Sequence, residues 1–247
     1  MRYFLELSYN GKAYHGWQNQ PNAISVQEVI EKSLSTLLGE PIDVVGAGRT
    51  DAGVHAKQMF AHFDTEVDFD ADNLAYKLNS FLPVDIAIHS VFKVKPELHA
   101  RFDASSRTYL YRITLQKNVF EFDNTYYVKQ PLDIGKMSAA AKILFEYNDF
   151  QCFSKSNTDV KTYYCDIMKA EWFLKDDELH FVIKANRFLR NMVRAIVGTM
   201  VEIGLGKLSV DDLHTIIQSK NRSEAGFSVP AHGLYLTEIE YPKDIKI

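Results

Sequence analysis

Apolar and polar residues recur along the first hundred positions in patterns that predict strands and helices in turn. A period of two is typical of a strand with one buried face, and a period near 3.6 is typical of a helix. Ser25 with Glu28 forms a capping box, and Asp70 caps a second helix that Pro83 ends. The patterns predict strands at 3–9, 42–45, 59–63 and 86–94, and helices at 25–38 and 70–81. The order β-α-β-β-α-β is that of a ferredoxin-like unit, an antiparallel sheet with both helices on one face and the other face free.

The second half shows similar patterns more loosely, without a detectable sequence repeat. Two alternating runs around the turn at 175–178 favour a β-hairpin, and Ser209 caps the last helix. The patterns predict strands at 108–115, 168–174, 179–185 and 235–241, and helices at 133–145, 188–203 and after Ser209. We therefore expect an α+β fold of two ferredoxin-like α/β units with mainly antiparallel sheets. The expected domains are 1–104 and 105–247.

The composition is that of a globular protein. Of the 247 residues, 46% are apolar and 24% charged, which excludes a disordered or fibrous chain. The most apolar stretch, 195–201, is far shorter than the ~20 residues that a membrane span needs, and the first residues do not resemble a signal peptide. We expect a cytoplasmic protein without a membrane partner. Cys152 and Cys165 match neither a zinc knuckle nor a redox pair, so we expect two reduced thiols in or near a core.

Charge gives two opposing indications about a nucleic-acid partner. The net charge of −4 argues against one. A phosphate backbone, however, is met by a local basic face, and seven of the nine arginines fall in three short segments. They are Arg49, then Arg101, Arg107 and Arg112, then Arg187, Arg190 and Arg194. Arginines also pair with structural acids, so this concentration is suggestive only.

The segment GRTDAGVHA, at 48–56, is the most informative. Its small residues let a bulky ligand approach the backbone of a loop at a strand end, where Arg49 and Asp51 place a cation and a carboxylate two residues apart. The segment has neither the ending of a Walker loop nor the glycine spacing of a dinucleotide fingerprint. The alternative is a tight turn with a surface ion pair.

Two further segments combine arginine with apolar or aromatic residues. In HARFDASSRTYLY, at 99–111, Tyr109 and Tyr111 point to one face of a strand, which suits either stacking on unpaired bases or ordinary core packing. In FLRNMVRAIVG, at 188–198, helical spacing would put the arginines on one face. Two interpretations stay open. One of these arginines reaches a buried carboxylate, or the arginines form a solvated basic stripe on the helix. The histidines show no metal-ligand spacing, and we expect His55 to be structural, like His62.

Five segments in order resemble the tRNA pseudouridine synthase A family over nearly the full length. They are YHGWQNQ at 14–20, GRTDAGVHA at 48–56, HARFDASSRTYLY at 99–111, FLRNMVRAIVG at 188–198 and PAHGLYL at 230–236. The resemblance implies an isomerase that converts uridine to pseudouridine at positions 38, 39 and 40 of the tRNA anticodon stem-loop. It also implies that no metal or organic cofactor is needed, that a homodimer binds each tRNA across both subunits, and that RNA-recognition-motif-like sheets form an RNA-binding cleft.

The resemblance also assigns roles to five residues. Asp51 is implied as the catalytic nucleophile or base, and Arg194 as the cation that pairs with it. Arg49 is implied to help displace the target base, Tyr109 to stack on it, and Leu234 to line the uracil pocket. A guanidinium beside a buried carboxylate favours its charged form, so Arg194 would keep Asp51 ionised at neutral pH. Whether the carboxylate adds covalently or removes a sugar proton stays open.

Two rival functions remain at this stage. A glycoside hydrolase or nucleosidase also acts at the anomeric carbon, but most such enzymes use two carboxylates, and the loop of Asp51 offers one. A non-catalytic RNA-binding protein of ferredoxin-like fold is the other rival, although the basic, glycine and aromatic pattern of an RNP1 motif is absent. Exchange of Asp51 for Asn separates them, because a binding protein keeps its function and an enzyme loses turnover.

Overall fold

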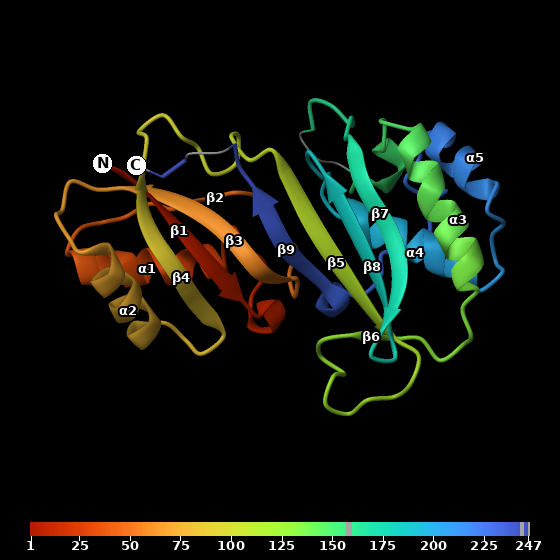
Figure 1. Cartoon of the computed structure of the whole chain (residues 1–247), viewed down its shortest axis with the longest axis horizontal. Helices are drawn as coiled ribbons and strands as arrows, with labels where there is room; N and C mark the ends of the chain where they lie inside the picture. Colours follow the sequence, from red (N-terminus) through yellow and green to blue (C-terminus); the bar gives the residue numbers. More distant parts are fainter. Residues whose placement is uncertain (157–159, 243–244, 247) are drawn as a thin grey trace. The chain divides into compact units, whose positions relative to one another are not determined.

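The computed structural model describes residues 1–156, 160–242 and 245–246, which form two compact units (Figure 1). Unit 1 comprises Met1–Ser106 and Leu236–Ile247, and unit 2 comprises Arg107–Tyr235. The predicted domains, 1–104 and 105–247, stay a prediction. In the described ranges, no helix is long and apolar enough to cross a membrane.

Unit 1 has the predicted order β-α-β-β-α-β. Its elements are β1 (Arg2–Tyr9), α1 (Val26–Leu38), β2 (Val45–Gly46), β3 (His55–Asp64), α2 (Ala71–Phe81) and β4 (Ile86–Val94). β1 pairs antiparallel with both β3 and β4, and the short β2 pairs antiparallel with β3. The helices α1 and α2 contact each other, and α2 also contacts β4, so both lie on one face of the sheet.

The helix boundaries of unit 1 follow the predicted caps. The backbone N–H of Glu28 donates to the Ser25 hydroxyl at 3.1 Å, and the N–H of Asn73 donates to the Asp70 carboxylate at 2.7 Å. α1 ends at Gly39, which adopts a left-handed φ of 75°. The strand predicted at 42–45 is wrong for its first three residues, because only Val45–Gly46 pairs with β3.

The two faces of β1 are not as different as the alternation suggested. Leu5 and Leu7 are fully buried, but Phe4 on the opposite face is also fully buried. The ring of Phe4 meets the Tyr241 ring at a centroid distance of 5.6 Å, and the Tyr241 hydroxyl donates to the carbonyl of Ala100. The face expected to be free is therefore covered at Phe4 by Tyr241, which belongs to the C-terminal segment of unit 1.

In its described residues, unit 2 combines a second set of strands with α-helices. Its elements are β5 (Ser106–Thr114), β6 (Tyr126–Tyr127), α3 (Ile134–Ile143), β7 (Ile167–Lys175), β8 (Glu178–Ala185), α4 (Met192–Gly204) and α5 (Asp212–Ser219), and β9 (Leu234–Glu240) begins here and continues into unit 1. β8 pairs antiparallel with β5 and with β7, and β6 pairs parallel with β5. The α+β class with mostly antiparallel strands is confirmed.

The hairpin of unit 2 and the burial of α4 have local causes. Asp176 and Asp177 adopt positive φ values of 48° and 64°, the conformation that a two-residue hairpin turn requires. α4 is buried on almost all sides and contacts α3. A Cβ at Gly198 would lie 1.7 Å from the carbonyl oxygen of Phe227, so the glycine lets that loop pack directly on the helix.

Candidate active site

The GRTDAG segment forms the loop between β2 and β3. The backbone N–H of Ala47 donates to the carbonyl of Phe60 at 2.8 Å, which extends the antiparallel pairing to the start of the loop. The loop then turns back through Gly53, whose φ is 78°, and the N–H of Val54 donates to the carbonyl of Asp51 at 3.1 Å. Asp51 is half-buried at this turn, so a strand pair and a glycine-built turn define its position.

Arg49 and Asp51 lie on the same loop but in different surroundings. Arg49 is exposed and Asp51 is half-buried. Between them, the hydroxyl of Thr50 shares a hydrogen bond of 2.9 Å with the buried Tyr9 hydroxyl. The strand that leaves the loop begins with His55, whose Nδ1 accepts the backbone N–H of Gly11 at 3.1 Å. That buried bond gives His55 a structural role, as the sequence suggested.

Tyr109 lies on β5 in unit 2, paired with Ile183 of β8. It is half-buried, and its ring meets the Phe188 ring edge to face at a centroid distance of 5.2 Å. Tyr111, two residues along the same strand face, is fully buried and donates its hydroxyl to the carbonyl of Pro230 at 2.8 Å. Tyr111 therefore packs in the core, while Tyr109 is only half-buried and its stacking on a base stays a prediction.

Arg194 lies in the first turn of α4 and is half-buried. Its Nε donates to the carbonyl of Val229 at 2.8 Å, and the N–H of Val229 donates back to the carbonyl of Arg194 at 3.2 Å. This pair fixes the guanidinium against the segment just before Pro230. Burial, and to a lesser degree Tyr126, raise the pKa of Tyr111 well above its usual value, while the nearby charge of Arg194 opposes that shift.

Leu234 is the first residue of β9 and is buried. A Cβ on the preceding Gly233 would lie 2.8 Å from the Tyr111 ring and 3.0 Å from the carbonyl of Arg112, so only glycine lets this segment approach β5. Tyr111 and Arg194 both bond to the segment before Leu234, at the carbonyls of Pro230 and Val229. Arg49 and Asp51 belong to unit 1, and the pairing of Asp51 with Arg194 stays a prediction.

The arginines of the FLRNMVR segment do not share one helix face. The helix predicted from residue 188 begins only at Met192, because Asn191 adopts a left-handed φ of 67° and donates its side-chain amide to the Ser228 hydroxyl at 2.7 Å. Arg187 and Arg190 therefore precede the helix. Arg187 donates to the carbonyl of Thr162 at 3.2 Å, and the prediction of a single stripe is wrong.

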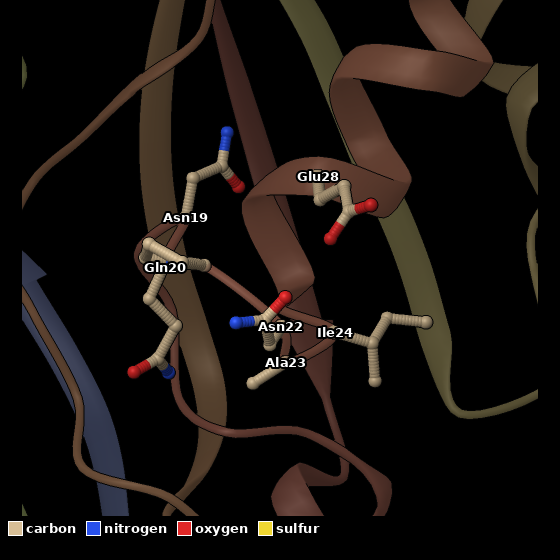
Figure 2. Close-up of a pocket in the computed structure, with 7 residues that line it drawn as sticks. Asn19, Gln20, Asn22, Ala23, Ile24 and Glu28 are labelled. Atoms are coloured by element: carbon tan, nitrogen blue, oxygen red, sulfur yellow. The ribbon is translucent and has the colours of Figure 1, made fainter.

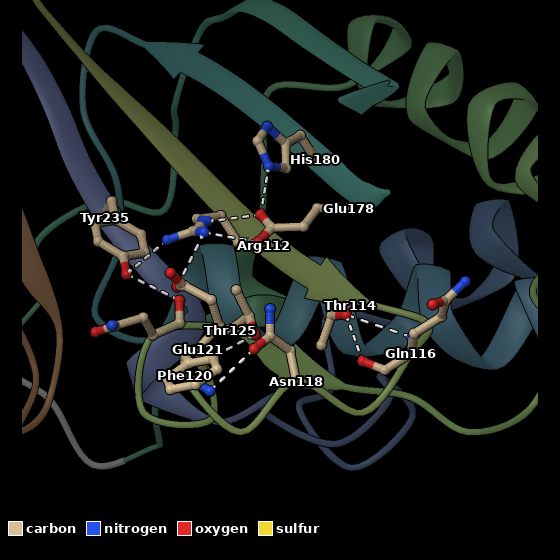
Figure 3. A network of polar contacts seen from close by, with 11 residues as sticks. Arg112, Thr114, Gln116, Asn118, Phe120, Glu121, Thr125, Glu178, His180 and Tyr235 are labelled. Atoms are coloured by element: carbon tan, nitrogen blue, oxygen red, sulfur yellow. Dashed lines mark hydrogen bonds and ion pairs between the residues drawn. The ribbon is translucent and has the colours of Figure 1, made fainter. Parts of the chain in front are cut away.

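Arg112, another member of the predicted basic cluster, is paired with acids (Figure 3). Its guanidinium donates two hydrogen bonds to Glu178, at 2.7 and 2.8 Å, and one to Glu121 at 3.2 Å. His180 also lies 2.8 Å from the Glu178 carboxylate. Burial would raise the pKa of Glu178, but the hydrogen bonds from Arg112 and His180 outweigh it and hold that pKa below its usual value. Arg112 thus stabilises the fold instead of forming part of an open basic face.

The cysteines, the possible metal ligands and the surface pocket give no second candidate for a catalytic site among the described residues. Both cysteines are buried, as expected, and burial raises the pKa of Cys152 to about 12 and that of Cys165 to about 11, so both stay protonated at neutral pH. Among the described residues, His, Cys, Asp and Glu form no group of three able to hold a metal ion. An open pocket of about 600 Å³ lies at the turn between Asn19 and Glu28 (Figure 2) and contains none of the predicted site residues.

Residues 14–17, for which the sequence patterns predict no role, contact the loop of Asp51. The N–H of Gly53 donates to the carbonyl of Tyr14 at 3.2 Å, and the N–H of Trp17 donates to the carbonyl of Thr50 at 3.4 Å. The segment YHGWQNQ contributes to the family resemblance and carries no catalytic pattern of its own. The isolated glycine between two aromatic residues was the one local signal that its backbone approaches another segment closely.

Comparison with known proteins gives a consistent result along the chain. The sequence model of a family described as tRNA pseudouridine synthase matches residues 7–103 and 140–242. The tRNA pseudouridine synthase A of Bacteroides fragilis is 55% identical over 246 residues, which cover 99% of this chain and 98% of that protein. The protein of the same name from Parabacteroides distasonis is 51% identical, covering 99% and 97%. The one from Thermoanaerobacter pseudethanolicus is 40% identical, covering 96% and 98%.

Proposed function

This chain belongs to the tRNA pseudouridine synthase family, and we propose that it isomerises uridine to pseudouridine at positions 38, 39 and 40 of the tRNA anticodon stem-loop. As a pseudouridine synthase it is an isomerase. The observation that carries the proposal is an identity above half over 99% of the chain to tRNA pseudouridine synthase A. The strand-end loop that presents a half-buried Asp51 supports it.

The reaction breaks the bond from ribose C1′ to uracil N1, turns the base and rejoins it through C5. All atoms stay in the substrate, so the proposed reaction needs no metal or organic cofactor. A stacked uridine must first leave the helix at a cost of a few kcal/mol. We propose that Arg49 helps to displace the base, and that stacking of the base on Tyr109 recovers part of this free energy. Tyr109 is only half-buried, which supports its assignment to stacking.

Asp51 is the proposed nucleophile or base. Its carboxylate either adds covalently to the base or the sugar, or removes a sugar proton to give a glycal-like intermediate. In a pocket without water, desolvation would favour the neutral acid, and a guanidinium partner offsets that effect. We assign this role to Arg194, whose Nε is fixed by Val229. The wall of the uracil pocket is assigned to Leu234, a buried residue that follows Gly233, whose backbone packs against Tyr111.

The finer description of the fold is also a proposal. We propose two ferredoxin-like domains, 1–104 and 105–247, each with its helices on one face of its sheet and with an RNA-binding cleft on the other side. The antiparallel pairing of β1 with β3 and β4 and of β2 with β3 in unit 1, with α1 contacting α2, supports this description for the first domain. The cytoplasm is the proposed location, where unmodified tRNA is available.

We further propose that the protein is a homodimer that binds each tRNA across both subunits. Three large apolar side chains on one loop of unit 2, Val119, Phe120 and Phe122, are 63%, 89% and 67% exposed and support a contact with a partner subunit. Sedimentation of Phe120→Ser at micromolar concentration then shifts toward the monomer relative to the parent protein. Monomeric parent protein would contradict the proposal.

The experiment that tests the proposed function uses the purified protein and an unmodified tRNA transcript, without added metal or nucleotide and with a chelator present. Pseudouridine is then mapped at each uridine. The proposal predicts modification at positions 38, 39 and 40 only. Modification outside the anticodon arm would change the substrate, release of free uracil would indicate a nucleosidase, and no modification would refute the function.

A further inference from the structure

Two backbone hydrogen bonds bracket Asp51 within unit 1. The carbonyl of Thr50, the residue just before it, accepts the N–H of Trp17 at 3.4 Å. The N–H of Gly53, two residues after it, donates to the carbonyl of Tyr14 at 3.2 Å. The carbonyl of Asp51 itself accepts the N–H of Val54 at 3.1 Å. The main chain is thus fixed immediately before, at and after the carboxylate.

The residues that provide these bonds are themselves held in place. Tyr14 is 5% exposed and donates its hydroxyl to the Asp85 carboxylate at 2.6 Å. Trp17 is 2% exposed, and its indole lies so close to Gly46 that a Cβ there would be 2.3 Å from Nε1. The segment 14–17 is therefore a rigid support and not a mobile strap.

Gly16 explains how the two segments come so close. Its φ is +92°, in the left-handed region, and a Cβ built on it would lie 2.2 Å from the carbonyl oxygen of Thr50. That oxygen is backbone, so any side chain at residue 16 must displace the main chain next to Asp51. Gly16 has no side chain that could react with a substrate, so it can act only by positioning the neighbouring backbone.

From these contacts we infer that residues 14–17 are the positioning element for Asp51, and we name them the Tyr14–Trp17 clamp. The inference rests on the proposed role of Asp51 in pseudouridine formation. A carboxylate that attacks a specific atom must be held to within about 0.5 Å, and a displacement of 1 Å costs on the order of a hundredfold in rate. Loss of the clamp therefore lowers the rate of the chemical step, while the affinity for tRNA stays nearly unchanged.

Gly16→Ala tests the inference, with Gly39→Ala as the matched control. Gly39 also lies in unit 1 with a left-handed φ, +75°, but a Cβ there meets nothing within 4 Å. Both substitutions place a side chain at a left-handed φ, and only the one at Gly16 brings a Cβ against Thr50. We expect the single-turnover rate at saturating tRNA to fall about a hundredfold in Gly16→Ala, with the tRNA Kd within about threefold of the parent. Gly39→Ala keeps the parent rate.

An equal loss of rate in the two variants, or a parent-like rate in Gly16→Ala, would overturn the inference. If Gly16→Ala does not fold, Tyr14→Phe replaces it, since that change removes only the hydrogen bond to Asp85. The expected result is then a rate about tenfold lower with an unchanged Kd, and a parent-like rate would overturn the clamp.

Amide hydrogen exchange tests the clamp independently of the proposed function. We expect exchange at Trp17 and Gly53 to be faster in Gly16→Ala than in Gly39→Ala, whatever the activity of the protein. Unchanged exchange at both amides would overturn the clamp. A parent protein that forms no pseudouridine would instead overturn the role of Asp51, and the exchange result would still decide whether the clamp holds the loop.

Discussion

Acidification is expected to weaken unit 1 through His62, a buried residue on the strand that follows the loop of Asp51. His62 is 4% exposed, and its Nδ1 accepts the backbone N–H of Ala100 at 3.1 Å. Burial, together with the charges of Arg2 and His99, lowers its pKa from 6.5 to about 4, while Asp64 opposes the shift. The folded protein therefore keeps His62 neutral in a range where the unfolded chain protonates it.

The sign and size of the effect follow from this difference in pKa. Below pH 6.5 the unfolded state binds a proton that the folded state does not bind until about pH 4. The stability that neutral His62 provides is complete at neutral pH and is lost as the pH falls from 6.5 to 4. At about 1.4 kcal/mol per pH unit, the free energy of unfolding drops by roughly 2 kcal/mol between pH 7 and pH 5.

Urea unfolding at pH 7 and pH 5 measures this drop. Trp17 lies in unit 1 and Trp172 in unit 2, so a Trp172→Phe background lets fluorescence report on unit 1. In that background, His62→Asn keeps an acceptor for the N–H of Ala100 and removes the titration. We expect the parent to lose roughly 2 kcal/mol more than His62→Asn over this pH range. Equal losses would refute the reasoning, because other titrating groups cancel in the comparison.

Three further changes test the packing and chemistry of unit 2. Glu178→Gln leaves the largely buried guanidinium of Arg112 with a weaker partner, and we expect the free energy of unfolding to fall by about 1–3 kcal/mol in urea titrations. Gly198→Ala places a Cβ against the carbonyl of Phe227, and thermal unfolding should show a loss of about 2 kcal/mol. We also propose that Tyr109 accepts the C5 proton in the last step of the reaction. Tyr109→Phe keeps the ring and removes the hydroxyl, so rapid quenching should then reveal an accumulated intermediate or slow product release. Normal turnover would exclude that proton role.

The sequence predicted helices and turns correctly where their formation depends only on neighbouring residues. The caps at Ser25 and Asp70 form as expected because both involve only neighbouring residues. The hairpin at 175–178 forms because two consecutive aspartates tolerate positive φ. Contacts distant in sequence were not visible. The burial of Phe4 depends on Tyr241, which lies over two hundred residues away.

In the candidate site too, the sequence identified residue types but not the contacts between residues distant in sequence. The family resemblance selected Asp51 and Arg194 by residue type, but no pattern indicated that Asn191 delays the start of α4. Its amide bonds to Ser228, which is remote in sequence, and this contact outweighs the helical spacing of the arginines. The pairing of Arg112 with Glu178 is likewise a cross-strand contact, and it removes one arginine from the predicted basic surface.

The most direct test of the account is the rate of pseudouridine formation by Asp51→Asn on a tRNA transcript. Asp43→Asn, at an exposed aspartate of the same unit, is the control and should turn over like the parent. We expect Asp51→Asn to lose at least about a thousandfold in rate while tRNA binds within about threefold of the parent affinity. Turnover by Asp51→Asn at the parent rate would contradict the account, because no carboxylate at residue 51 would then be needed.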